Sequence, residues 1–170
     1  MIDELKNIEY VLFDLDGTVS DSSEGITKSA DKALKSEGID VPFETLTSFI
    51  GPALRVSFGR YTDDVEKRDR MLDVYRERYS EKGWCENKIY PGMAELLRDL
   101  QKSGKHVVLA SAKPEYFCRK IIKYFGVEQY FDFIGGSDME GKRDDKTVLL
   151  TYVLDNIGLS LIHISEPTRL

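Results

Sequence analysis

The chain alternates between short apolar runs and longer amphipathic segments. The apolar runs at residues 11–15, 105–110 and 131–134 contain few polar positions, which is typical of strands buried on both faces of a parallel sheet. The amphipathic segments predict helices; they cover residues 22–37, 43–50, 63–82, 91–104, 114–125 and 144–157. Strand–helix alternation at this spacing predicts parallel strands joined by right-handed crossovers, so the expected fold class is α/β with a Rossmann-like sheet.

The helices predicted between residues 22 and 82 follow one another with no strand between them. The longest of them carries a stripe of side chains that is expected to be buried; its members are Val65, Met71, Leu72, Tyr75 and Tyr79. Such a run fits a small helical bundle inserted into the α/β core. We therefore expect a core formed by residues 1–20 and 88–158, and a helical cap formed by residues 21–87.

Two carboxylates, Asp14 and Asp16, stand at the end of the first apolar run. Burying them there is costly unless a cation or a proton compensates their charge. Side chains two residues apart on a strand lean to the same side, so the pair is expected to share one hard cation. Gly17 allows the backbone to turn sharply beside that cation. An ordinary turn explains one aspartate and the glycine but not two acids in an apolar strand, so we interpret this segment as a functional site.

Ligands of open α/β sheets bind beyond the carboxyl ends of the strands. Ser111 follows the second predicted strand, and Lys146 begins the helix after the third, beyond a predicted turn at residues 135–137. A hydroxyl, a cation and a helix N-terminus suit a phosphoryl group. Each residue alone is weak evidence, because such a serine is usually a turn residue and most lysines are solvated. Lys142 and Arg143 compete with Lys146 for this role.

The segment Phe13-Asp-Leu-Asp-Gly-Thr-Val-Ser-Asp21 resembles the first motif of the haloacid-dehalogenase-like hydrolases, an apolar strand followed by DxDGT. Over roughly residues 5–158, the chain is similar to the family's phosphatases with a helical cap after this motif, the phosphoglycolate-phosphatase-like and 5'-nucleotidase-like branch. Ser111 and Lys146 match the second and third motifs of that family.

The resemblance implies a two-step hydrolysis of a small phosphorylated metabolite, such as phosphoglycolate or a nucleotide. Asp14 would attack phosphorus and form an aspartyl-phosphate, while Asp16 would protonate the leaving oxygen and later deprotonate the attacking water. Mg²⁺ would be held by the Asp14 carboxylate and the Asp16 backbone carbonyl. A haloacid dehalogenase is disfavoured, because those members lack an acid at the position of Asp16.

Further candidates surround the expected site. Residues 49–55 resemble the cap loop that reaches toward the active site in the family, which makes Arg55 a candidate for substrate recognition; a solvated helix arginine is the alternative. Lys113 is expected either to reach the phosphate or to face solvent, and it ranks below Ser111. Structural roles are expected for His106 at a strand boundary, for Asp63–Asp64 at a helix start, and for Trp84, Tyr75 and Tyr79 in cap packing. Asp144–Asp145 are also expected at a helix start, with metal binding as the less favoured alternative.

The last residues carry a different signal. Residues 159–169 match the translation of an adapter used in transposase-based sequencing libraries, so we expect everything after about Gly158 to be non-biological and the gene to continue beyond it. The family's last motif, an apolar strand ending in GDxxxD, would then be missing together with a metal ligand. Residues 11–15 would then form an exposed apolar edge, so we expect poor solubility. We also expect residues 161–164, which are apolar and strand-like, to occupy the vacant position beside that edge in a structure of this chain.

Composition narrows the possible partners. With 170 residues, of which 41% are hydrophobic and 32% charged, the chain has enough material for one globular core. Its net charge of −6 argues against nucleic acid, which requires a basic face. No apolar run is long enough to span a bilayer, and no signal-peptide pattern begins the chain. Cys85 and Cys118 lack metal-ligand spacing, so a reduced cytoplasmic protein is expected.

Three functions remain open at this point. The first is a Mg²⁺-dependent phosphomonoesterase, and the second is a sugar-phosphate mutase of the same fold, which retains the phosphoryl group for transfer. The third is an inactive fragment that binds phosphate or metal weakly or only aggregates. The sequence indicates neither the specific substrate nor the oligomeric state.

Overall fold

The centre of the protein is a parallel sheet. In the computed structural model, which describes residues 7–159, three strands are hydrogen-bonded in the order β1-β4-β5. They are β1 (Tyr10–Phe13), β4 (His106–Pro114) and β5 (Phe133–Ser137). Both pairings are parallel, so the carboxyl ends of all three strands meet at one edge. The predicted α/β class with a parallel sheet is confirmed.

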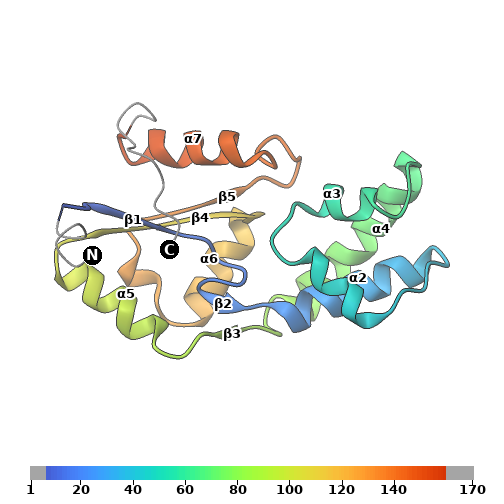
Figure 1. Ribbon diagram of the computed structural model, residues 1–170, viewed down its shortest axis with the longest axis horizontal. Coiled ribbons are helices and arrows are strands. Elements are labelled where there is room, and N and C mark those ends of the chain that lie inside the picture. The colour runs from blue at the N-terminus through green and yellow to red at the C-terminus, as the bar shows by residue number, and fades with distance from the viewer. Residues whose placement is uncertain (1–6, 160–170) are drawn as a thin grey trace.

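Helices cover both faces of this sheet (Figure 1). α7 (Lys146–Asn156) lies on one face, whereas α5 (Met93–Lys102) and α6 (Glu115–Tyr124) lie on the other. The short 3-10 helix η3 (Glu128–Tyr130) leads from α6 toward β5. Because side chains alternate along a strand, Val108 of β4 packs with α7 while its two neighbours on the strand join the cluster beneath α5 and α6.

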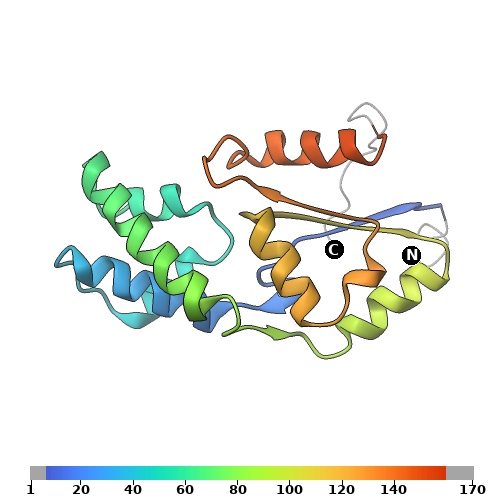
Figure 2. The same cartoon turned by 180° about the vertical axis from the view of Figure 1, so that it is seen from behind.

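Between β1 and β4 the chain forms a helical insertion, residues 23–83, beyond the carboxyl ends of the strands (Figures 1 and 2). Its elements are α2 (Ser23–Ser36), the 3-10 helix η1 (Phe43–Phe49), α3 (Leu54–Gly59), α4 (Val65–Arg78) and the π-helical turn η2 (Tyr79–Gly83). A short antiparallel pair, β2 (Ser20–Asp21) and β3 (Lys88–Ile89), connects it to the sheet. The division into two domains stays a prediction.

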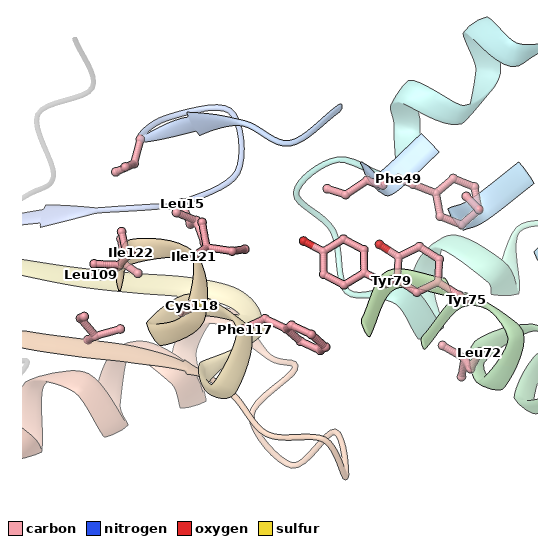
Figure 3. Packing of buried hydrophobic residues seen from close by; sticks show 14 of the residues in the cluster. Leu15, Phe49, Leu72, Tyr75, Tyr79, Leu109, Phe117, Cys118, Ile121 and Ile122 are labelled. Atoms are coloured by element: carbon pink, nitrogen blue, oxygen red, sulfur yellow. The ribbon is translucent and has the colours of Figure 1, made fainter. Parts of the chain in front are cut away.

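The insertion and the core share one hydrophobic cluster (Figure 3). Phe49 and Leu72 contribute from the insertion, and Leu109 and Ile121 contribute from the core. Phe117 of α6 joins the two parts, because its ring meets that of Tyr79 edge-to-face at a centroid distance of 5.1 Å. This contact places the end of α4 directly against the core helix.

Several helix predictions need correction. α4 begins two residues late, because the Asp64 side chain accepts hydrogen bonds from the backbone of Glu66 and Lys67 and so caps the helix. Val65, expected in the buried stripe, is 55% exposed because the first turn of α4 projects into solvent. No helix was predicted over residues 54–59, where the structure has α3. Trp84 packs against Tyr124 of α6 rather than only within the cap.

The strand boundaries also differ from the predictions. β1 ends at Phe13 rather than at residue 15. Leu12 of this strand is 38% exposed, because α7 packs over β4 and β5 and not over β1. β4 extends to Pro114, which places Ser111 within the strand instead of after it. The turn predicted at residues 135–137 belongs to β5. Its glycines serve close packing instead, since a Cβ at Gly135 would collide with Val153 of α7.

Within residues 7–159, no helix combines the length and hydrophobicity that crossing a bilayer requires. Cys85 is exposed, Cys118 is buried, and both are free thiols. The predictions for residues 160–170, including a strand at residues 161–164, concern a part of the chain outside the described residues.

Candidate active site

The candidate site begins where β1 ends. The carbonyl oxygen of Leu15 accepts hydrogen bonds from the backbone of Thr18, Val19 and Ser20, at 3.3, 3.0 and 3.1 Å, which closes a tight turn. Gly17 lies in this turn with φ +77°, a conformation that favours glycine. The turn therefore holds the residues on either side of Leu15 at the carboxyl edge of the sheet.

Asp14 lines a small cavity together with Lys146 and Asp144. The Leu15 backbone donates a 2.7 Å hydrogen bond to Asp14 Oδ1, which fixes the carboxylate. Lys146 is the first residue of α7. The Asp145 side chain caps this helix by accepting hydrogen bonds from the backbone of Thr147 and Val148. The structure thus brings together a carboxylate and a lysine that were predicted as nucleophile and phosphate ligand.

Asp16 lines the adjoining cavity, between the insertion and the core. Its Oδ2 atom lies 3.0 Å from Lys113 Nζ, and the two side chains are only 9% and 6% exposed. Its Oδ1 atom is buried and has no hydrogen-bond partner among the described residues. The expectation that the two carboxylates lean to the same side and share one cation stays a prediction; the strand ends at Phe13, and each aspartate lines a different one of the two adjoining cavities.

The side chain of Lys113 is buried, so it does not face solvent, which was one of the two alternatives expected for it. Its ammonium group also donates a 2.9 Å hydrogen bond to Tyr79 Oη and lies 4.6 Å from the centre of that ring. Burial by itself would lower the pKa of Lys113, but the Asp16 carboxylate and the Tyr79 hydroxyl raise it well above its ordinary value. Lys113 is therefore a buried cation bound to Asp16.

The cavity beside Asp16 is largely aromatic and apolar on its insertion side. Tyr75 and Tyr79 stack with a centroid distance of 5.5 Å, and their hydroxyl groups point toward the core (Figure 3). Burial raises the pKa of both hydroxyls, so they are neutral. Other apolar side chains that line this cavity include Ile26, Phe49, Leu54 and Leu72 of the insertion and Phe117 and Met139 of the core.

Two arginines of the insertion line the same cavity. Arg55 lies 3.3 Å from Asp69 and is 39% exposed in its side chain, so it is a cation at the rim that is partly neutralised. Arg76 of α4 donates a 3.0 Å hydrogen bond to the carbonyl oxygen of Met139, in the loop after β5. This bond is a further direct contact between the insertion and the core, and Arg76 gave no signal in the sequence beyond its helical position.

Ser111 is placed differently from the other predicted phosphate ligand. It is 2% exposed, and its hydroxyl accepts a 3.4 Å hydrogen bond from the backbone of Lys113. Its neighbours Ala110 and Ala112 line the Asp14 cavity, because alternate residues of β4 point to opposite sides. Ser111 therefore lies next to the cavity without lining it.

The two competitors of Lys146 lie outside the cavity that contains Asp14. Arg143 lies over the ring of Tyr152, 4.1 Å from its centre, and within 4.0 Å of Glu115. Lys142 is exposed and its backbone binds the Asp138 carboxylate. Neither lines the cavity that contains Asp14, whereas Lys146 does.

His106 has an acidic partner that its sequence context did not reveal. Its Nδ1 atom lies 3.2 Å from Asp132, and its ring stacks on Tyr10 with a centroid distance of 4.7 Å. It stands at the start of β4, at the opposite end of the strand from Lys113. The prediction of a boundary role is consistent with this position.

Comparison with known proteins identifies the family. The family described as haloacid dehalogenase-like hydrolase matches residues 11–160. The chain belongs to this family. The predicted resemblance is thereby confirmed over nearly the whole chain.

Relatives within the family carry several names. A 5'-nucleotidase of Pseudomonas aeruginosa is 39% identical over 155 residues, which cover 90% of this chain and 70% of that protein. A phosphoglycolate phosphatase of Aquifex aeolicus is 30% identical over 152 residues, covering 89% and 71%. The tyrosine-protein kinase PtkA of Mycobacterium tuberculosis is 36% identical over 147 residues; the match covers 86% of this chain and half the length of PtkA.

Solved structures of the family agree. A predicted phosphatase from Clostridium acetobutylicum superimposes with a TM-score of 0.86 at 40% identity, covering 89% of this chain and 71% of that one. The chain is therefore a haloacid dehalogenase-like hydrolase with phosphatases among its relatives.

The first turn offers oxygen ligands for a divalent cation. Within residues 7–159, no group of three or more acidic, histidine or cysteine side chains could hold a metal ion. Mg²⁺ in phosphoryl-transfer sites is commonly bound by one or two carboxylates, with waters and substrate phosphate completing its shell. The Asp14 carboxylate and the nearby backbone carbonyls suit this shared type of site better than a cage made by protein alone.

Proposed function

We propose that this chain is a Mg²⁺-dependent phosphomonoester hydrolase that acts on a small phosphorylated metabolite through an aspartyl-phosphate. The observation that carries the proposal is that each of the two carboxylates shares a cavity with a different lysine. Asp14 shares its cavity with Lys146, whereas Asp16 is held by Lys113 in the adjoining cavity. The two aspartates thus have separate environments, which suits separate roles.

In the first step, an Asp14 oxygen attacks phosphorus and the bond between phosphorus and the ester oxygen breaks. Asp16 gives its proton to the departing oxygen, and Lys146 neutralises charge on the phosphoryl oxygens. In the second step, water attacks phosphorus, gives its proton to Asp16, and inorganic phosphate leaves Asp14. The acid of the first step is thus the base of the second.

Mg²⁺ would be held by the Asp14 carboxylate and the Asp16 backbone carbonyl, as the family resemblance implies. When bound, it would reduce the repulsion between the Asp14 carboxylate and the anionic phosphate. Lys146, the exposed first residue of α7, supplies positive charge to the same cavity.

The cavity beside Asp16 supports a leaving group with apolar or aromatic surface. Its lining includes Phe49, Tyr75 and Phe117, and Arg55 stands at the rim. A leaving group as small and anionic as glycolate would leave this apolar lining unused, whereas a nucleoside or an aryl group would contact it. We therefore favour a nucleotide-like or aryl phosphate within the general class.

The test is phosphate release from 4-nitrophenyl phosphate by the chain with Mg²⁺, compared with Asp14→Asn. We expect turnover by the unaltered chain and only background release by the variant, because an amide oxygen is a far weaker nucleophile than a carboxylate. Hydroxylamine should trap the acyl phosphate on the unaltered chain only. Equal release by the two proteins would remove the enzymatic proposal and leave the inactive fragment.

The mutase alternative is separated by the fate of the phosphoryl group. Hydrolysis delivers all of it to water, while a mutase returns it to a phosphorylated sugar. Radiolabelled substrate distinguishes the two, since label in inorganic phosphate supports the hydrolase and label retained in sugar bisphosphate supports the mutase.

A further inference from the structure

Three side chains from distant parts of the chain form a continuous buried series that is joined by one hydrogen bond and one ion pair. Tyr79 Oη accepts a 2.9 Å hydrogen bond from Lys113 Nζ, and that nitrogen lies 3.0 Å from Asp16 Oδ2. Tyr79 belongs to the insertion, Lys113 to the end of β4, and Asp16 to the turn after β1. The insertion therefore contacts the proposed acid–base residue through a single intermediate.

The two carboxylate oxygens of Asp16 have different surroundings. A lysine ammonium group has three donors and no acceptor, so the oxygen facing it cannot carry a proton toward it. That oxygen is Oδ2, whereas Oδ1 is buried without a partner. A proton that Asp16 exchanges with a substrate is consequently placed on Oδ1.

We propose that Tyr79 is a positioning residue for Asp16 and acts through Lys113. By accepting a hydrogen bond from Lys113, the Tyr79 hydroxyl holds the ammonium group against Oδ2 and leaves Oδ1 as the oxygen that exchanges a proton with the leaving group. This inference rests on the proposed phosphomonoester hydrolysis and adds that a residue of the insertion sets the orientation of its acid–base group.

The position of Tyr79 is itself fixed from several sides. Its ring stacks on Tyr75 with an interplanar angle of 9° and meets Phe117 edge-to-face. It is 2% exposed and begins the π-helical turn that ends α4, a type of turn that often occurs at functional sites. In Figure 3 the hydroxyl of Tyr79 points from the insertion toward the core. A ring held so firmly can orient a lysine whose own stem is flexible.

The test uses the leaving group of the substrate. Phenolate is a much stronger base than 4-nitrophenolate, so its departure depends far more on a correctly placed general acid. The parameter to compare is kcat/KM, because it reports the steps up to and including departure of the leaving group. A defect in folding or binding lowers kcat/KM for phenyl phosphate and for 4-nitrophenyl phosphate by similar factors, while misplacement of the acid does not.

For Tyr79→Phe, which keeps the ring, we expect kcat/KM to fall about tenfold with phenyl phosphate and at most about twofold with 4-nitrophenyl phosphate. The larger loss is a fraction of the 10²- to 10⁴-fold that a general acid typically contributes. Tyr61→Phe, the same change at a tyrosine of the insertion outside the cavity, should leave both values unchanged. Equal losses with the two substrates, or none, would overturn the inference.

A double variant tests whether Tyr79 acts through Lys113. Once Lys113→Met has removed the ammonium group, adding Tyr79→Phe should cause no further selective loss with phenyl phosphate. Losses that multiply would mean that Tyr79 acts independently and would contradict the proposal. If the unaltered chain hydrolyses neither ester, the proposed function itself fails and this inference with it; activity with an unchanged substrate ratio refutes the inference alone.

Discussion

Gly25 of α2 packs directly against Gly83 at the end of the π-helical turn. A Cβ at Gly25 would collide with the carbonyl oxygen of Gly83, which is backbone and cannot rotate away. We expect Gly25→Ala to lower the free energy of unfolding by about 1–3 kcal/mol, the usual cost of overpacking. Urea denaturation followed by circular dichroism measures this change.

Gly59→Ala is the matched control for that prediction. Gly59 ends α3, and a Cβ there would meet nothing nearer than Arg68 Nη1 at 4.0 Å. Since alanine is favoured over glycine in a helix, the substitution should stabilise the protein by up to about 1 kcal/mol. If both variants lost the same stability, the close approach of the two backbones would not be the cause.

Single residues differ in how well the sequence reveals them. Asp14 and Asp16 stand out because acids are costly beside a buried strand, and Lys146 stands out by its place at the start of a helix. Lys113 is no more conspicuous than any surface lysine, and its partner Tyr79 lies 34 residues earlier in the chain. That contact exists only once the insertion has packed against the core, so no local pattern encodes it.

At the scale of elements, an ion pair ties α4 to the segment that returns to the sheet. Arg78 donates two hydrogen bonds to Glu86, at 2.8 and 3.0 Å, and one to Ser29 of α2 at 3.1 Å. The arginine holds the pKa of Glu86 below its ordinary value of 4.5, against the smaller opposing effect of burial. The pair spans the π-helical turn on which Tyr79 lies.

The pH dependence follows from the sign of that shift. A carboxyl whose pKa is lower in the folded state stabilises the fold fully above pH 4.5 and loses this contribution as the pH falls through the folded value. Glu86→Gln should therefore cost about 1–2 kcal/mol at pH 7 and progressively less below pH 4.5, as measured by urea denaturation.

Glu77→Gln provides the comparison for Glu86→Gln. Glu77 pairs with Lys32 at 3.3 Å, and both side chains are about half exposed or more, at 63% and 49%. Exposed pairs contribute little, so this variant should unfold like the unaltered chain at every pH. A matching loss in both variants would point to a general effect of charge instead of the pair with Arg78.

Periodicity predicted long elements well and short ones poorly. α2, α5, α6 and α7 lie within a few residues of their predicted positions, and the first three carry an apolar stripe long enough to be recognised. α3, β2 and β3 have six, two and two residues, too few for a periodic signal. The glycines at 135 and 136 suggested a turn, whereas the fold uses them for close packing within β5.

At the scale of the molecule, the alternation of strands and helices was sufficient to predict a parallel sheet with an inserted helical segment. The order of strands was not accessible in the same way, because it depends on which edges pair in space. Among residues 7–159, β1 pairs only with β4 and so lies at an edge of the sheet. Leu12 of this strand is 38% exposed. The strand also leads into the turn that contains the two aspartates.

An edge strand with exposed apolar side chains is a template for pairing with another chain. We therefore expect the protein to form larger species in gel filtration as its concentration rises. Leu12→Lys should shift the elution profile toward the monomer, since charged side chains disfavour pairing at an edge.

Val65→Lys is the control, because Val65 is 55% exposed on α4, away from the sheet. The same shift with both substitutions would assign association to general surface hydrophobicity, and a sharp monomer peak of the unaltered chain at high concentration would show that the edge of β1 is protected.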